Sequence, residues 1–173
     1  MATYTLIDSE VLTSSQASVT FSAIPATFTD LVVRVSARCS VGAARTGLNL
    51  TLNGSSVAVY SYTILYASGA SASSYNGGSS TSLAEFIGAN GATSTTNTFA
   101  NDEIYIPNYA SSAYKVLSGV TAQEINSTGN NLNQVAAGLW SNTAAITSIT
   151  LVDNNASNFV SGSSFYLYGI SSS

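Results

Sequence analysis

Histidine is absent from this 173-residue sequence, and cysteine occurs once, at Cys39. Without histidine the sequence cannot form a Ser-His-Asp or Cys-His catalytic group, and one cysteine can neither hold a structural zinc ion nor close an intrachain disulfide. These absences exclude most hydrolase chemistry. Because no histidine can activate Cys39, we expect it to be a small buried apolar residue rather than a nucleophile.

Charged residues are also scarce. They make up 7% of the sequence, four basic against eight acidic, for a net charge of -4. This balance offers no basic patch for a phosphate backbone, so we expect no nucleic-acid partner. Arg34 and Arg38 share one predicted strand face with Asp30, and together with Arg45 they indicate a solvated face rather than an anion site.

Long apolar runs are missing as well. No segment approaches the ~18 apolar residues of a membrane-spanning helix, and residues 1–8 show neither the basic nor the apolar region of a signal peptide. We therefore expect no membrane insertion and synthesis in the cytoplasm. Hydrophobic residues still make up 45% of the sequence, which is enough to form a core.

What the sequence does contain is alternation of apolar and polar residues with a period of two, as in residues 30–39, which is typical of β-strands. Residues 48–52 show the same pattern, and Asn53-Gly54 after them predicts a tight hairpin turn into a strand over 57–66. The other predicted strands are 4–12, 18–21, 83–87, 98–106, 114–121, 135–140, 145–151 and 163–170.

No segment has a helical pattern, so the fold class is all-β. We predict a single domain over residues 1–173, an antiparallel β-sandwich with a jelly-roll-like topology favoured and other Greek-key arrangements open. Segments 67–81, 88–97 and 123–133 are rich in small and polar residues and are predicted to be long loops.

Catalytic and cofactor sites are not predicted. Asp102 and Glu103 are adjacent on a predicted strand, where neighbouring side chains point to opposite faces, so they should be surface carboxylates rather than an acid/base pair. A calcium site and a glycosidase pair stay open as minor alternatives. Gly77-Gly78 lacks the lysine and the helix of a phosphate-binding loop, and we expect no cofactor. The acidic residues are Asp8, Glu10, Asp30, Glu85, Asp102, Glu103, Glu124 and Asp153.

Tyrosines are the most conspicuous candidates for recognition. Tyr60, Tyr62 and Tyr66 fall on one face of a predicted strand, and Tyr75 follows in the next segment. Such a row is more often the inward face of a sheet than a sugar-stacking platform, and both interpretations stay open. Trp140 is expected to pack in the core.

Four stretches resemble small virion proteins of tailed bacteriophages. They are residues 18–38 (SVTFSAIPATFTDLVVRVSAR), 97–117 (NTFANDEIYIPNYASSAYKVL), 136–151 (AAGLWSNTAAITSITL) and 158–170 (NFVSGSSFYLYGI). The resemblance is to β-sandwich modules of capsid-decorating and tail-fibre proteins. It implies a location in the virion and carries over no functional residue.

Two functions follow as expectations. The first is a non-enzymatic virion structural protein, a capsid decoration or cement protein that assembles as a homo-oligomer, with a trimer favoured, on other virion proteins such as the major capsid protein. Its N-terminal segment, about residues 1–12, would be an arm or edge strand contacting a neighbour through Tyr4, Leu6 and Ile7. The alternative is a tail-fibre or receptor-binding module that recognises host glycans. Its contact candidates are Tyr60, Tyr62, Tyr66 and Tyr75.

Overall fold

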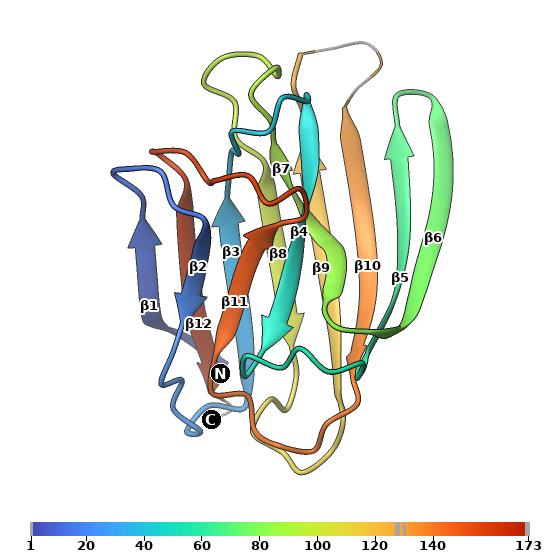
Figure 1. Ribbon diagram of the computed structural model, residues 1–173. Coiled ribbons are helices and arrows are strands. Elements are labelled where there is room, and N and C mark those ends of the chain that lie inside the picture. Colours follow the sequence, from blue (N-terminus) through green and yellow to red (C-terminus); the bar gives the residue numbers. More distant parts are fainter. Residues whose placement is uncertain (1, 127–128, 130, 172–173) are drawn as a thin grey trace.

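The computed structural model describes residues 2–126, 129 and 131–171 and shows a sandwich of two antiparallel sheets without helices (Figure 1). The large sheet has the strand order β1-β12-β3-β8-β9-β10-β5-β6. Its strands are β1 (Thr3–Val11), β12 (Ser164–Ser171), β3 (Asp30–Ser36), β8 (Asn101–Ile106), β9 (Lys115–Gln123), β10 (Leu132–Trp140), β5 (Tyr60–Ser68) and β6 (Ser71–Ser80).

The small sheet covers the middle of the large one and leaves both of its margins free (Figure 1). It has the order β2-β11-β4-β7, with strands β2 (Ser18–Phe21), β11 (Ile149–Asp153), β4 (Arg45–Leu52) and β7 (Leu83–Asn90). The chain crosses repeatedly between the two sheets. The predicted antiparallel β-sandwich is confirmed.

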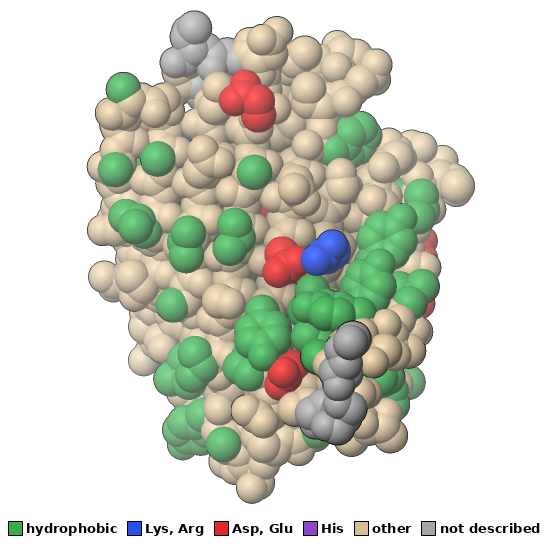
Figure 2. Space-filling model, turned by 180° about the vertical axis from the view of Figure 1, so that it is seen from behind, with side chains coloured by type: hydrophobic (Ala, Val, Ile, Leu, Met, Phe, Trp, Pro, Cys, Tyr) green, Lys and Arg blue, Asp and Glu red, His purple; other side chains and the backbone are tan. Residues whose placement is uncertain are grey.

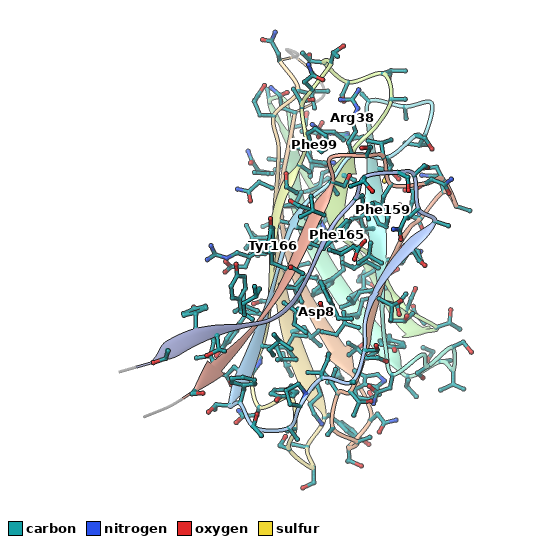
Figure 3. All side chains as sticks on the ribbon, turned by 90° about the vertical axis from the view of Figure 1, so that its left-hand side faces the viewer. Asp8, Arg38, Phe99, Phe159, Phe165 and Tyr166 are labelled. Atoms are coloured by element: carbon teal, nitrogen blue, oxygen red, sulfur yellow. The ribbon has the colours of Figure 1, made fainter. Side chains whose placement is uncertain are left out.

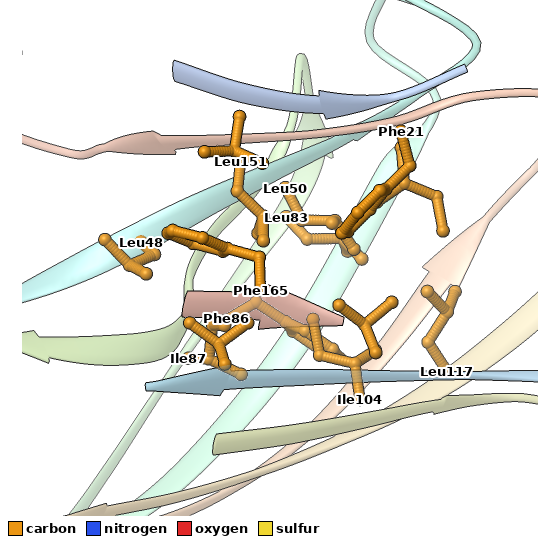
Figure 4. Packing of buried hydrophobic residues seen from close by; sticks show 14 of the residues in the cluster. Phe21, Leu48, Leu50, Leu83, Phe86, Ile87, Ile104, Leu117, Leu151 and Phe165 are labelled. Atoms are coloured by element: carbon orange, nitrogen blue, oxygen red, sulfur yellow. The ribbon is translucent and has the colours of Figure 1, made fainter. Parts of the chain in front are cut away.

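One core fills the space between the sheets, because alternate residues of each strand face inward. Buried and exposed positions alternate along the whole of β9. Leu48 and Leu50 of β4 and Phe86 of β7 lie opposite Ile104 and Leu117 of the large sheet (Figure 4).

The outward and inward faces of β12 show the same principle from the side (Figure 3). Phe165 points between the sheets and packs edge-on against Phe159, with ring centroids 4.9 Å apart. Tyr166, the next residue, points away from the sandwich (Figure 3).

The predicted hairpin after β4 is wrong, although its turn exists. Asn53 and Gly54 both have positive φ angles, 53° and 62°, and the Ser55 N–H donates to the Leu52 carbonyl at 3.0 Å. However, β4 pairs with β11 and β7, and β5 lies in the other sheet. The Asn53 side chain accepts a hydrogen bond from the Thr147 N–H at 2.7 Å, so the turn is tied to the chain before β11.

The predicted loop over 67–81 is also wrong, because most of it forms β6. Ser71–Ser80 pairs with β5 as a hairpin, and Gly69, at φ 58°, lies in its turn. Asn76, Gly77 and Gly78 of β6 are of residue types with low strand propensity. Hydrogen bonding to β5 along one side outweighs that low propensity. The composition of the segment does not reveal that such a partner strand exists.

The described residues contain no helix that is long and apolar enough to cross a membrane.

Candidate functional site

A cleft of about 270 Å³ opens between the two sheets beside β7, the edge strand of the small sheet. The β5–β6 hairpin of the large sheet extends past β7 at this margin (Figure 1). Its lining comes from both sheets and is mainly polar. The lining residues with the largest side chains are Arg45, Tyr66, Tyr75, Glu85, Gln123, Leu132 and Gln134. We call this the β6–β7 cleft.

Three of the four predicted recognition tyrosines come together beside this cleft. The ring centroids of Tyr66 and Tyr75 are 5.9 Å apart and those of Tyr62 and Tyr75 are 6.5 Å apart, both edge-on. Gly77 makes room for this cluster, since a Cβ there would lie 2.5 Å from the Tyr62 ring. The face of β5 that carries the tyrosines therefore points inward. Tyr66 on that face and Tyr75 of β6 form one wall of the cleft.

Tyr60 is separate from this cluster and belongs to the core. It is 1% exposed, and its hydroxyl accepts a hydrogen bond from the Leu52 N–H at 2.9 Å. It also lies within hydrogen-bond distance of the Leu52 carbonyl, at 3.2 Å. The Tyr60 hydroxyl thus satisfies the backbone groups of Leu52 at the end of β4, and the buried ring is not available to a ligand.

Glu85 is positioned by an irregularity in β7 that the sequence pattern did not indicate. Between Leu48 and Leu50 the register of β4 against β7 shifts, and Glu85 has a positive φ of 53°. The Asn49 side chain accepts from the Glu85 N–H at 2.9 Å, which stabilises this conformation. A Cβ on Gly47 would lie 2.5 Å from the Glu85 Cβ, so only glycine fits beside it. Strained, over-determined backbone of this kind concentrates at functional sites.

The Glu85 carboxylate lines the cleft with both oxygens engaged. The Tyr75 hydroxyl donates to Oε2 and the Asn154 amide donates to Oε1, each at 2.8 Å. Burial and this hydrogen bond to Glu85 raise the pKa of Tyr75, so the phenol stays neutral and acts as the donor.

Two glutamines and an arginine also line the cleft. The Gln123 amide donates to the Ala89 carbonyl at 2.6 Å, and the Gln134 amide donates to the Glu85 carbonyl at 2.8 Å. These bonds tie β7 to β9 and β10. Arg45, at the start of β4, donates to the Ser68 hydroxyl at 2.9 Å, so a cation and an anion line the same cleft.

Asp102 lies buried next to the cleft, and its prediction as a surface carboxylate is wrong. It is 2% exposed; Oδ1 accepts from the Gly88 N–H at 3.0 Å and from the Thr121 hydroxyl at 2.6 Å, while Oδ2 has no partner. Burial raises its pKa to about 7. Glu103 does lie on the opposite face, where its carboxylate pairs with Arg34 at 3.0 Å.

The prediction of Arg38 as part of a solvated face needs correction too. Its guanidinium donates to backbone carbonyls of the β7–β8 connection, including Thr95 at 2.8 Å and Ser94 at 3.1 Å (Figure 3 labels Arg38). Arg38 therefore organises this connection, because one guanidinium offers five donors in a fixed geometry.

The N-terminal contact candidates lie on β1, an open edge strand of the large sheet. Tyr4 and Leu6 are 57% and 52% exposed. Ile7 differs from them: it sits at a register shift between Leu6 and Asp8 and packs against the core. The shift turns one side chain of the strand inward while Tyr4 and Leu6 stay outside.

The outer face of the large sheet carries exposed apolar side chains (Figure 2). Leu65, Val135 and Val120 are cross-strand neighbours on β5, β10 and β9 and are each more than half exposed. Among the described residues of these three strands, no outward position is charged. Toward β1 the face becomes aromatic, with Tyr166 and Tyr168 stacked at 6.4 Å between centroids.

Other predicted positions are structural. Cys39 is fully buried, as expected, and burial raises the pKa of its thiol to about 12. Trp140 is in the core, as expected, with the Lys115 ammonium 5.9 Å from its ring centre. Within residues 2–126, 129 and 131–171, no three acidic or cysteine side chains gather in a way that could hold a metal ion.

Comparison with known proteins assigns the chain to no family. No family model matches the sequence, and no curated protein matches it. Among solved structures, the chain is similar to the galectin LEC-6 of Caenorhabditis elegans, with a TM-score of 0.37 and 10% identity over 93% of this chain and 95% of that one.

Proposed function

We propose that this protein is a structural component of a tailed-bacteriophage virion, a capsid decoration protein that works through assembly rather than catalysis. The observation that carries the proposal is the outer face of the large sheet over β5, β10 and β9 (Figure 2). Exposed apolar side chains stand there on neighbouring strands, and no described outward residue of these three strands is charged. Contiguous exposed apolar patches mark interaction sites on soluble proteins. The sequence stretches that resemble decorating modules agree with this use.

Charge favours close packing of many copies. The chain has a net charge of -4, and Arg34 and Glu103 neutralise each other on the outer face. Repulsion between neighbouring copies is therefore small, which suits a protein crowded on a shell. In this proposal the outer face over β5, β10 and β9 contacts the shell protein.

The open edge at β1 is the proposed contact between copies. An edge strand presents unpaired N–H and C=O groups, and pairing it with another chain provides affinity and removes an aggregation hazard. Tyr4 and Leu6 flank that edge as exposed apolar groups. A closed ring of copies, with a trimer favoured, follows if this edge meets a different surface of the next copy and the rotation between copies closes.

The decisive experiment measures the copy number of this chain in purified particles by quantitative mass spectrometry against the major capsid protein. A copy number comparable to that of the capsid protein supports decoration. A small fixed number refutes decoration and places the chain in the tail, and absence from particles refutes a virion role.

A matched pair of variants tests the contact face. Val135→Asp places a charge in the middle of the apolar row, where the side chain is 57% exposed, and should abolish incorporation. Val57→Asp is the control, because Val57 is 60% exposed but lies in the β4–β5 connection. Equal incorporation of both folded variants would rule out the outer face as the contact.

A further inference from the structure

We propose that the β6–β7 cleft binds one neutral sugar residue of a glycan. This inference concerns a different surface from the outer sheet face and does not depend on where the protein sits in the virion. It rests on four properties of the cleft: an aromatic wall, a carboxylate and a guanidinium that line one space, a size suited to a single ring, and a backbone held in a strained conformation.

The aromatic wall provides an apolar surface of the right kind. Tyr66 and Tyr75 line the cleft and are half-buried, so part of each side chain is available to a ligand. A tyrosine ring offers a large apolar face with a polar tip. A sugar ring matches it, since its C–H groups form an apolar face and its hydroxyls lie around the rim.

The polar groups match hydroxyls in both directions. A carboxylate offers about four acceptor positions, and Tyr75 and Asn154 occupy two of those on Glu85. The remaining positions can accept from ligand hydroxyls, while the Arg45 side chain is a donor only. A hydroxyl both donates and accepts, so neighbouring hydroxyls on one ring can satisfy both residues.

Charge and size select a neutral ligand of one ring. An anion would be attracted by Arg45 but repelled by Glu85, and a cation would meet the reverse. The volume of about 270 Å³ lies just below the roughly 300–1,000 Å³ of drug-sized pockets, which suits a single sugar ring with its neighbour in solvent.

The cleft is held ready before a ligand arrives. The positive φ of Glu85 is maintained by the Asn49 side chain and by the absence of a side chain at Gly47. Gln123 and Gln134 fix the backbone of β7 from beneath. Preorganised polar groups on rigid strands bind with less loss of conformational freedom than groups on loops.

Nuclear magnetic resonance titration of the full chain tests the proposal. The probes are methyl glycosides of glucose, galactose, mannose and N-acetylglucosamine, with N-acetylneuraminic acid and glucose 6-phosphate as anionic comparisons. We expect saturable shifts of the amide signals of Gly47, Glu85 and Gly88 with at least one neutral glycoside, and at least tenfold weaker binding of the anions.

Variants connect binding to the named groups. Glu85→Gln and Tyr66→Ala should each weaken binding of the responsive glycoside at least tenfold, with the dispersion of the amide spectrum showing that the fold is kept. Tyr114→Ala is the matched control, since Tyr114 is 59% exposed outside the cleft, and it should bind as the unaltered protein does. Should Glu85→Gln fail to fold, Tyr66→Ala still decides.

Three results of the titrations would overturn the inference. They are no saturable shift with any neutral glycoside, shifts that map to another surface, and tighter binding of the anions. Unchanged binding by folded Tyr66→Ala would equally remove the cleft as the site. None of these results bears on capsid incorporation through the outer face, so the two proposals can fail independently.

Discussion

Asp102 makes the stability of this protein depend on pH between about 4 and 7. The chain has no histidine, so no imidazole titrates between pH 4 and 7. Burial raises the pKa of Asp102 from 3.8 to about 7 in the folded state. Between these values the folded chain holds a proton that the unfolded chain releases, so the free energy of unfolding falls as pH rises from 4 to 7 and then levels.

The magnitude follows from the size of the shift. One pKa unit corresponds to about 1.4 kcal/mol, so a rise from 3.8 to about 7 amounts to about 4 kcal/mol. Because Asp102 is 2% exposed, solvent screens its charge very little. Asp102→Asn removes the ionisable group and keeps an oxygen that can accept from the Gly88 N–H and the Thr121 hydroxyl. We expect this variant to be more stable than the unaltered protein by up to about 4 kcal/mol at pH 8 and similar to it at pH 4.

Urea denaturation followed by circular dichroism from pH 4 to pH 8 measures both effects, with Asp8→Asn as the control at an exposed carboxylate. The unaltered protein and Asp8→Asn should lose stability in parallel as pH rises, whereas Asp102→Asn should show a nearly flat profile. Two results would refute the reasoning that burial destabilises the ionised form of Asp102. One is a stability of the unaltered protein that does not change with pH, and the other is an Asp102→Asn variant less stable than the unaltered protein at pH 8.

Three further outcomes are expected. Tyr60→Phe should lower the free energy of unfolding by about 1–3 kcal/mol in urea denaturation, because the buried Leu52 N–H loses its acceptor; an unchanged value would mean that another group satisfies it. Gly138→Ala should also cost about 1–3 kcal/mol, since the new Cβ would lie 2.8 Å from the Phe86 ring, and a stabilised variant would show a void that the packing does not indicate. The thiol of Cys39 should not react with Ellman's reagent at pH 8 until urea unfolds the chain, because it is fully buried and its pKa is raised to about 12.

The partner-contact residues predicted from the tyrosine row illustrate how far sequence reasoning reached. A period of two placed Tyr60, Tyr62 and Tyr66 on one face, and that face does point inward. The pattern could not separate Tyr60, which is sealed in the core by its hydrogen bonds to Leu52, from Tyr66, which reaches the cleft. That distinction depends on where the small sheet ends above the large one, and strand periodicity carries no information on it.

By itself the sequence determined the fold class, the strands with strong alternation and the burial of Cys39 and Trp140, because the period of two assigns each apolar side chain to a face and burial of that face drives folding. Only the tertiary structure decided that the serine-rich segment Ser71–Ser80 is a strand and that the Asn53-Gly54 turn leads into the other sheet. It also decided that Glu85 lines a cleft and that Asp102 is buried beside it. These outcomes depend on long-range pairing. β5 supplies the partner that β6 needs, β4 pairs with β11 and β7 rather than with β5, and the environment of Asp102 is set by strands distant in the sequence.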